Sequence, residues 1–156
     1  MIRMIAAVDE AWGIGREGRI PWYLPEDLKH FSKLTTGQHV IMGRATADSI
    51  PRGLPNRTSW IVSRQSPAQY ENPDRGMVVH RVGSLDEALQ GSNHHAWIIG
   101  GQSLYEEGLP LAREIYLTRV VGHYDCDRFF PQLNTEWGLV WEEAHSGYRF
   151  LRLRRG

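Results

Sequence analysis

The chain has 156 residues, enough for one domain whose folding buries about 70% of the surface that the unfolded form exposes. Lysine plus arginine and aspartate plus glutamate number 18 each, so the formal charge is zero, which argues against nonspecific binding to nucleic acid or to acidic membranes. Cys126 is the only cysteine, which excludes an intrachain disulfide, and no apolar run approaches the roughly 18 to 20 residues that span a bilayer.

Short apolar runs of strand length recur along the chain and alternate with segments of helical character. Several runs are apolar at consecutive positions, as in strands that are covered on both faces. We expect strands at residues 2–8, 39–42, 59–62, 77–82, 96–99 and 115–121. We expect helices at residues 25–35, 44–50, 84–90 and 102–109. Ser84 with Glu87 forms a capping box for the third helix, although Asp86 could also serve.

The alternation of strands and helices predicts an α/β fold with a mostly parallel sheet, whose ligands bind at the carboxyl ends of the strands. Two further runs, residues 139–144 and 148–153, predict an antiparallel hairpin that closes the sheet. Arginines alternate with apolar and aromatic side chains in the second of these runs, which favours a strand with a solvated rim over a basic binding tail. No linker or repeat interrupts the chain, so we expect residues 1–156 to form a single domain.

Two long irregular segments, residues 9–24 and 64–76, interrupt the pattern. The first, called the lid segment below, holds three glycines ahead of Pro21 and Trp22, which suits a mobile loop that leads into a rigid rim. Its GIG sequence at residues 13–15 is a weak phosphate motif, because it neither follows a strand directly nor opens a helix.

Adjacent His94 and His95 lack the spacing of shared metal ligands, and no cluster of cysteines or carboxylates accompanies them. The N-terminal sequence MIRMIAAV lacks the length and the cleavage site of a secretory signal. We therefore expect a cytoplasmic protein without a metal site.

One acidic residue, Asp27, stands among the apolar side chains of Trp22, Leu24, Leu28 and Phe31. If the proline two positions before it opens a helix, Asp27 and Phe31 lie on the same face. A carboxylate in apolar surroundings favours a catalytic or binding role. The alternative is a first-turn acid that meets the positive end of the helix dipole, a contribution of about 0.3 to 1 kcal/mol. This segment alone leaves both interpretations open.

Two strand-to-helix turns are candidate phosphate sites, GRAT at residues 43–46 and GGQSLY at residues 100–105. Free backbone N–H groups, and glycines that allow close approach, suit an anion there. Each turn alone would be a routine connection, but two of them, with Arg64 at the end of a third strand, favour a long, multiply phosphorylated ligand. Arg57 could hold a carboxylate through its planar guanidinium, or could be an exposed turn residue.

In combination these segments resemble the dihydrofolate reductase family. The segments that carry the resemblance follow the family order over nearly the whole chain: IAAV at 5–8, GIG and IPWYLPEDLKHF within 13–31, VIMGRATADSI at 40–50, LPNR at 54–57, IVSR at 61–64, IIGGQSLY at 98–105, IYLT at 115–118 and DRFFP at 127–131. The combination of PW...D, MGR...T and GG...Y is highly specific. The fold implied is a mostly parallel, eight-stranded sheet flanked by helices, with a final antiparallel strand.

The resemblance implies dihydrofolate as the substrate and NADPH as the cofactor. It places Asp27 at the pterin ring, with Thr118 hydrogen-bonded nearby and Trp22 in the same catalytic group. The residues that would bind the substrate are Ile5, Leu28, Phe31, Ile50, Leu54, Arg57 and Ile99, with Arg57 on the glutamate carboxylate. The residues that would bind the cofactor are Ala7, Ile14, Gly15, Gly43, Arg44, Ala45, Thr46, Ser63, Arg64, Gly100, Gly101, Gln102, Ser103, Leu104 and Tyr105.

The activity implied is hydride transfer from the nicotinamide to C6 of dihydropterin, with protonation of N5, by a protein that we expect to be a monomer. The resemblance also implies that Asp127 hydrogen-bonds the lid segment in its closed form, and that the peptide bond between Gly100 and Gly101 is cis. Three positions depart from the commoner family pattern and bear on folate affinity and lid motion: Trp12, Ser32 and Ala47.

Two other interpretations of the sequence stay open. A pyrimidine reductase of riboflavin synthesis shares the fold and NADPH, but such domains generally lack the acid after the PW pair, so Asp27 argues against it. A noncatalytic protein could retain the fold as a structural component, and the sequence does not exclude this.

Overall fold

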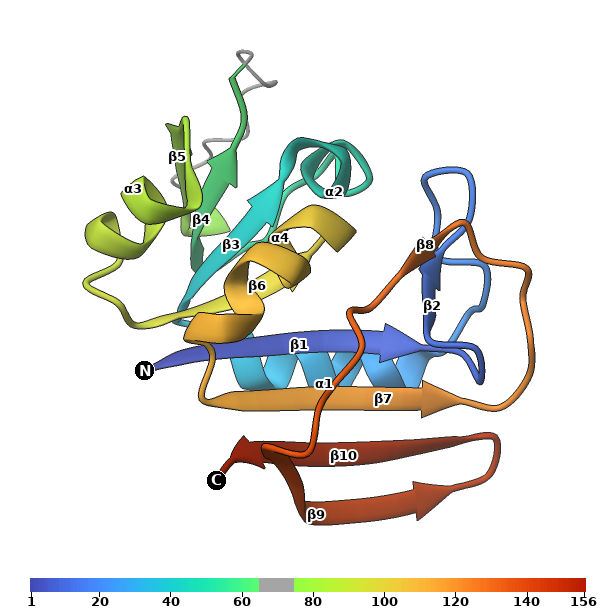
Figure 1. Ribbon diagram of the computed structural model, residues 1–156. Coiled ribbons are helices and arrows are strands. Elements are labelled where there is room, and N and C mark those ends of the chain that lie inside the picture. Colours follow the sequence, from blue (N-terminus) through green and yellow to red (C-terminus); the bar gives the residue numbers. More distant parts are fainter. Residues whose placement is uncertain (65–74) are drawn as a thin grey trace.

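The structure is a computed structural model that describes residues 1–64 and 75–156, and its centre is an eight-stranded sheet (Figure 1). From one edge of the sheet to the other, the strands are β5 (Met77–Val82), β4 (Arg57–Val62), β3 (His39–Gly43), β6 (Ala96–Gly100), β1 (Ile2–Val8), β7 (Glu114–Val120), β10 (Tyr148–Arg155) and β9 (Trp137–His145). Neighbouring strands from β5 to β7 are parallel, and β10 is antiparallel to both β7 and β9. The predicted mostly parallel sheet and closing hairpin are confirmed.

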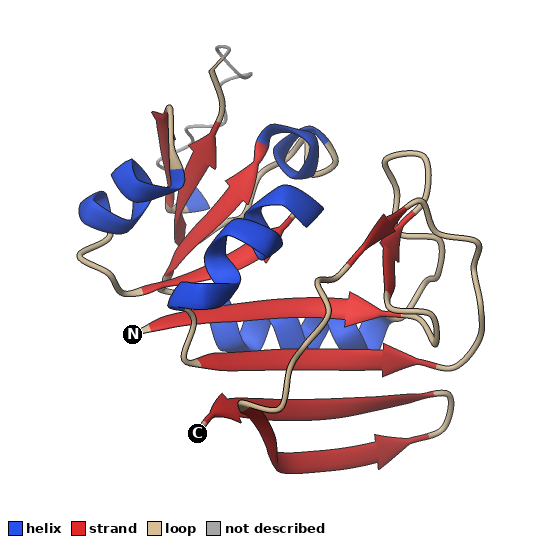
Figure 2. Cartoon of the chain, in the orientation of Figure 1, coloured by secondary structure: helices blue, strands red, loops and turns tan. Residues whose placement is uncertain are grey.

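Helices cover both faces of this sheet (Figure 2). In Figure 1, α1 (Pro25–Thr35) passes behind β1 and β7, whereas α3 (Leu85–Gly91) and α4 (Gln102–Gly108) lie in front. The apolar residues form two clusters accordingly. One cluster joins β1, β6 and β7 to α3 and α4, and the other contains Ile5, Val40 and Trp97, with Phe31 of α1 packed against it. Strands buried on both faces explain the consecutive apolar residues of the sequence.

The helix termini follow the expected signals with small differences. Pro25 is at the start of α1, and Ser84 Oγ accepts a hydrogen bond from Glu87 N at 3.1 Å, which caps α3. The carboxylate of Glu87 accepts from Gly83 N instead of completing the box at Ser84. The expected helix 44–50 is shorter, because α2 (Arg44–Asp48) ends before Ser49, and a short 3-10 turn, η2 (Leu109–Leu111), follows α4.

The expectation that the lid segment is wholly irregular is wrong. It contains a short strand, β2 (Gly13–Gly15), which pairs antiparallel with β8 (Arg128–Phe129) in a second, two-stranded sheet. Three residues give no readable alternation, and the partner lies more than a hundred residues away, so local sequence signals could not reveal this pairing. Most of the second irregular segment, residues 64–76, falls outside the described residues.

Candidate active site

Asp27 lies in the first turn of α1, and its side chain reaches the neighbouring sheet. Thr118, near the carboxyl end of β7, donates its hydroxyl to Oδ1 of Asp27 at 2.5 Å. Burial raises the pKa of Asp27, while the Thr118 hydrogen bond and the nearby His30 oppose that rise. Within the described chain no protein group hydrogen-bonds Oδ2 of Asp27. The acid is therefore held on one side and left available to a ligand on the other.

His30 and Phe150 pack close to this acid, and neither was predicted from the sequence as a site residue. The two rings are stacked, with centroids 3.9 Å apart and an interplanar angle of 13°. Phe150 of β10 lies directly opposite Thr118 in the antiparallel register. Burial lowers the pKa of His30, and the carboxylate of Asp27 raises it. The three-residue spacing of Asp27 and His30 in a helix was the signal that could have found this neighbour.

Trp22 lies just before α1 and packs against Tyr124, another residue that the sequence did not single out. The rings meet edge to face, with centroids 5.3 Å apart. Both residues line a surface hollow of about 520 Å³, which also includes Leu24 and Tyr148. The structure thus places Trp22, near the end of the lid segment, against the 121–126 connection.

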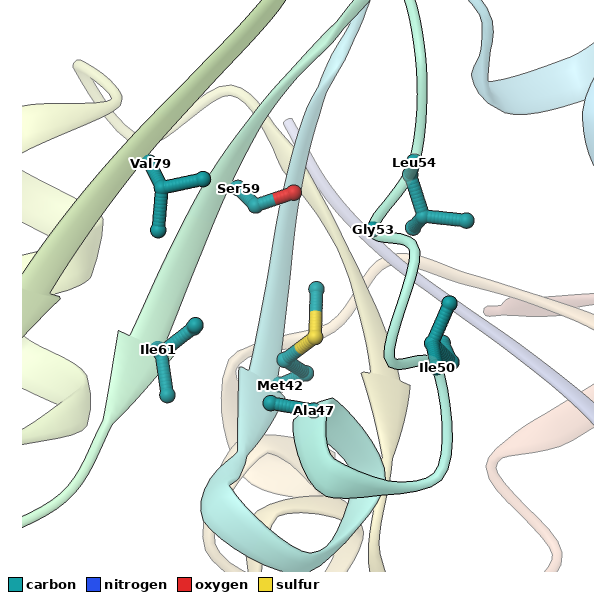
Figure 3. A pocket seen from close by; sticks show the side chains of 8 residues that line it. All are labelled: Met42, Ala47, Ile50, Gly53, Leu54, Ser59, Ile61 and Val79. Carbon is teal, nitrogen blue, oxygen red and sulfur yellow. The ribbon is translucent and has the colours of Figure 1, made fainter. Parts of the chain in front are cut away.

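Most residues predicted to contact the substrate gather on the α1 face of the sheet. Ile5, Phe31, Leu54 and Ile99 belong to one apolar cluster. Ile50 joins them at a void of about 10 Å³ that it lines with Leu54 (Figure 3). A void of this size has room for about one water and none for a pterin ring. Leu28 is an exception, since it is 57% exposed.

Arg57 is buried at the start of β4, so the alternative of an exposed turn arginine is wrong. It is 7% exposed, and its Nε and Nη1 donate to Pro55 O at 2.9 Å and to Thr35 Oγ1 at 3.0 Å. The guanidinium carbon lies 5.8 Å from the centre of the Phe31 ring. Nη2 has no partner among the described residues, so a donor stays available for an anionic group.

The two predicted phosphate turns are brought together because β3 and β6 are neighbours, with Met42 beside Gly100. The peptide bond between Gly100 and Gly101 is cis, as expected from the resemblance. A Cβ built on Gly100 would lie 3.3 Å from Thr46 Oγ1, so a side chain at this glycine would crowd the first turn of α2. Gly43 and Gly101 are the N-cap residues of α2 and α4. This close glycine-lined contact fits a phosphorylated cofactor.

Several residues predicted to bind the cofactor have partners in the protein. Tyr105 is buried and donates its hydroxyl to Ile5 O at 2.7 Å, and burial raises its pKa. Gln102 Oε1 accepts from Phe129 N at 2.8 Å and so links α4 to β8. The exposed Arg44 has its Nε 3.7 Å from Asp48 Oδ2.

The remaining predicted cofactor residues have varied surroundings. Ala7 is paired with Thr118 across β1 and β7, Ile14 packs on the core, and Leu104 is buried. Exposed positions are Ala45, Arg64 and Ser103, while Gly15 and Ser63 are half-buried.

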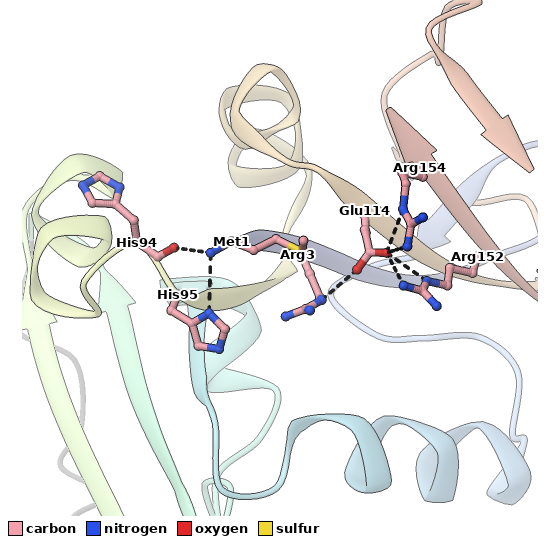
Figure 4. A network of polar contacts seen from close by, with 7 residues as sticks. All are labelled: Met1, Arg3, His94, His95, Glu114, Arg152 and Arg154. Carbon is pink, nitrogen blue, oxygen red and sulfur yellow. Dashed lines mark hydrogen bonds and ion pairs between the residues drawn. The ribbon is translucent and has the colours of Figure 1, made fainter. Parts of the chain in front are cut away.

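Arg152 and Arg154 of β10 lie away from Asp27, toward the start of β7. Glu114 is 1% exposed, and its carboxylate binds Arg3 at 2.9 Å together with Arg152 and Arg154 (Figure 4). These hydrogen bonds outweigh the effect of burial and lower the pKa of Glu114 to about 2. Arg152 and Arg154 are therefore part of the scaffold.

The described residues lack two further features. No group of three or more histidine, cysteine, aspartate or glutamate side chains there is arranged to hold a metal ion. No helix in the described ranges is long and apolar enough to cross a membrane.

Comparison with known proteins gives one family. The family model for dihydrofolate reductase matches residues 1–152. A dihydrofolate reductase of Bacillus subtilis is 36% identical over 146 residues, which cover 92% of this chain and 83% of the relative. The type 3 dihydrofolate reductase of Salmonella typhimurium is 41% identical over 148 residues, covering 93% of this chain and 88% of the relative.

A solved structure agrees with these sequence matches. Dihydrofolate reductase from Enterococcus faecalis, complexed with NADP(H) and RAB-propyl, superposes with a TM-score of 0.84 and 29% identity. The match covers 100% of this chain and 96% of that one. These matches show that the chain belongs to the dihydrofolate reductase family.

Proposed function

We propose that the protein reduces 7,8-dihydrofolate to tetrahydrofolate with NADPH, by hydride transfer to C6 of the pterin and protonation of N5. The observation that carries this function is Asp27, a half-buried acid that Thr118 holds through one oxygen only. The family to which the chain belongs supports the same reaction.

Asp27 acts by binding and electrostatics. Its carboxylate accepts hydrogen bonds from the amino group and a ring nitrogen of the pterin, while Thr118 fixes the orientation of Oδ1. An anion beside the ring favours the protonated pterin, so proton delivery to N5 becomes easier. No covalent nucleophile is needed.

The apolar cluster on the α1 face positions the substrate. Ile5, Phe31 and Ile99 would pack on the pterin and aminobenzoyl rings and exclude water. The buried Arg57 would bind the glutamate carboxylate with the donors that the protein does not use. Alignment of the two reacting rings at near-attack distance contributes several kcal/mol, on the order of what orientation supplies in other enzymes.

The diglycine turn and its neighbours would hold the cofactor. NADPH supplies the hydride when it is bound. Ala7, Ile14 and Tyr105 would surround the nicotinamide, and Arg44 and Arg64 would bind the phosphate that distinguishes NADPH from NADH. The closely packed glycines at 100 and 101 support this assignment.

The pyrimidine reductase alternative is disfavoured by Asp27 and by the family match. A noncatalytic role is the remaining alternative, since a protein without the activity could have the same fold. The single domain over residues 1–156, the monomeric state, the cytoplasmic location and the absence of nucleic-acid binding stay predictions.

One assay separates these functions. Purified protein is mixed with dihydrofolate and NADPH, and the absorbance at 340 nm is followed. Loss of absorbance that depends on both compounds supports the reductase. Stable absorbance with a protein that is folded by circular dichroism would favour the noncatalytic alternative.

A further inference from the structure

Asp9 follows β1 directly and is completely buried, with 0% of its surface exposed. Oδ1 accepts hydrogen bonds from the backbone N–H groups of Ala11 at 2.9 Å and Gly13 at 2.8 Å. Oδ2 accepts from the N–H of Tyr124 at 3.0 Å and lies 3.7 Å from the thiol sulfur of Cys126. We call this group, Asp9 with Gly13, Tyr124 and Cys126, the aspartate clasp.

The clasp joins the start of the lid segment to a connection more than a hundred residues away. Gly13 is required for it, because a Cβ at that position would lie 2.3 Å from Cys126 Cβ and 3.1 Å from Asp9 Oδ1. The backbone of Asp9 also donates to Gly13 O at 3.0 Å, which closes a tight turn. The base of the lid segment is therefore fixed by a buried anion.

The clasp also stays charged near neutral pH. Burial alone would raise the pKa of Asp9, but the hydrogen bonds from Tyr124, Gly13 and Ala11 and the contact with Cys126 outweigh it, so the pKa lies below its usual value. A carboxylate that accepts hydrogen bonds from several N–H groups holds the segments that carry those groups together.

Tyr124 extends the clasp toward the substrate side. Its N–H is bound by Asp9, and its ring packs edge-on against Trp22, five residues before Asp27. Neither Asp9 nor Tyr124 is among the residues assigned to substrate or cofactor. A shift of the clasp would nevertheless move the Trp22 ring and the lid segment together.

We propose that Asp9 is a positioning residue for hydride transfer, which acts through Tyr124 on Trp22 and on the lid segment. The proposal rests on the reductase function proposed above. It differs from the expected role of Asp127, an exposed residue that binds the outer part of the lid segment through Glu17 N at 3.0 Å.

The experiment compares Asp9→Asn with Tyr124→Leu, which keeps the backbone N–H but removes the ring from Trp22. The matched control is Asp125→Asn, because Asp125 lies in the same connection with 76% of its side chain exposed. For each variant we measure the single-turnover rate of hydride transfer and the dissociation constants of NADPH and dihydrofolate. Asp9→Asn places an amide donor against N–H groups, so it should disturb the clasp with little change in volume.

We expect Asp9→Asn and Tyr124→Leu each to slow hydride transfer by about tenfold or more, since small displacements of positioning groups have effects of this size. Both dissociation constants should stay within about threefold of the unmodified protein, and Asp125→Asn should match that protein. The double variant should be no slower than the slower single variant, because both changes interrupt one route.

Two results would overturn the proposal. One is an Asp9→Asn protein that is less stable to heat yet transfers hydride at the normal rate, which makes the clasp a structural tie only. The other is a double variant whose two effects multiply, which shows that Asp9 does not act through Tyr124. If Asp9→Asn fails to fold, a normal rate in Tyr124→Leu still rejects the route.

A second readout does not depend on activity. Fluorine NMR of protein labelled with fluorotryptophan, with the Trp22 signal assigned by Trp22→Phe, reports the surroundings of that ring directly. Asp9→Asn should shift the Trp22 signal and Asp125→Asn should not. An unmodified protein without reductase activity would reject the proposed function, whereas an unshifted Trp22 signal would reject the positioning role.

Discussion

Asp9 directly follows β1 and Asp27 lies in the first turn of α1, and the fold places these two carboxylates in opposite electrostatic environments. Asp9 is fully buried, and the hydrogen bonds that it accepts hold its pKa below the usual value. Asp27 is only partly buried, but burial outweighs its hydrogen bond from Thr118 and raises its pKa. The fold therefore satisfies one anion completely and leaves the other partly unsatisfied.

The same difference is found elsewhere in the molecule, between charges that the fold compensates, called scaffold charges below, and charges in the candidate site. Glu114 resembles Asp9, because Arg3, Arg152 and Arg154 compensate its charge. Arg64, exposed after β4, resembles Asp27, and Arg44, exposed after β3, has only a long 3.7 Å contact with the exposed Asp48. A charge that the described residues compensate only in part is one that a ligand can use. The following predictions test that distinction.

The largest effect is expected at the two exposed cations. Replacing Arg44 and Arg64 with glutamine should raise KM for NADPH by about two to four orders of magnitude, if each contact with the 2′-phosphate contributes roughly 1.5 to 3 kcal/mol. KM for NADH should change little, because its hydroxyl is neutral. Steady-state kinetics with both cofactors tests this, with Arg149→Gln on β10 as the control. Equal kcat/KM for NADPH and NADH in the unmodified protein would show that these arginines are only solvated.

The second-largest effect on activity is expected at Asp27. Asp27→Asn should lower the rate near neutral pH by a factor on the order of a hundred or more, with partial recovery in acid, where the substrate can arrive protonated. NADPH affinity should be unchanged, as should the activity of Asp86→Asn, a control on the exposed side of α3. Turnover near the normal value at pH 7 would remove Asp27 from the mechanism.

The scaffold charge Glu114 should affect stability and leave the reaction unchanged. Glu114→Gln should lower the free energy of unfolding by about 2 kcal/mol at pH 7, in the range of hydrogen bonds to charged groups. Because the pKa of Glu114 is about 2 in the fold and 4.5 as the reference value, its contribution is fully present above pH 4.5 and is lost as the pH falls through 2. Urea unfolding at several pH values, with kcat measured in parallel, checks both parts. A deficit that is independent of pH would contradict the assignment.

A smaller effect is expected at the exposed end of the lid segment. Asp127→Ala removes one hydrogen bond, from Glu17 N, and should slow hydride transfer by about three- to tenfold, as the loss of roughly 1 kcal/mol predicts. Folate affinity should fall less than the rate. Equal changes in both quantities, or none, would show that residues 9–24 act only as a connector.

The sequence predicts the strands well because their apolar runs are local and are buried on both faces. It also predicts the Asp27–Thr118 pair and the cis bond at Gly100, because these follow from family motifs. In the proposed function these residues contact the substrate or the cofactor.

The contacts that the sequence does not predict join residues that are far apart along the chain. The clasp joins Asp9 to Tyr124, and the stacking behind Asp27 joins His30 to Phe150, which is on the last strand. No local periodicity encodes such contacts. The burial of Arg57 is similar, because its partner Thr35 lies on a different element.

The most direct test of the contrast is the thermal unfolding of two matched variants without ligands, Asp27→Asn and Asp9→Asn, at pH 7. The raised pKa of Asp27 means that its ionised form destabilises the fold, so Asp27→Asn should raise Tm, and this gain should vanish below the reference value of 3.8, where the acid is protonated in both states. The lowered pKa of Asp9 means the reverse, so Asp9→Asn should lower Tm at pH 7, and the loss should shrink as the pH falls below 3.8. The predicted result is a change in Tm of opposite sign in the two variants. A decrease in Tm of similar size in both would contradict the distinction between Asp27, whose charge the fold compensates in part, and Asp9, whose charge it compensates fully.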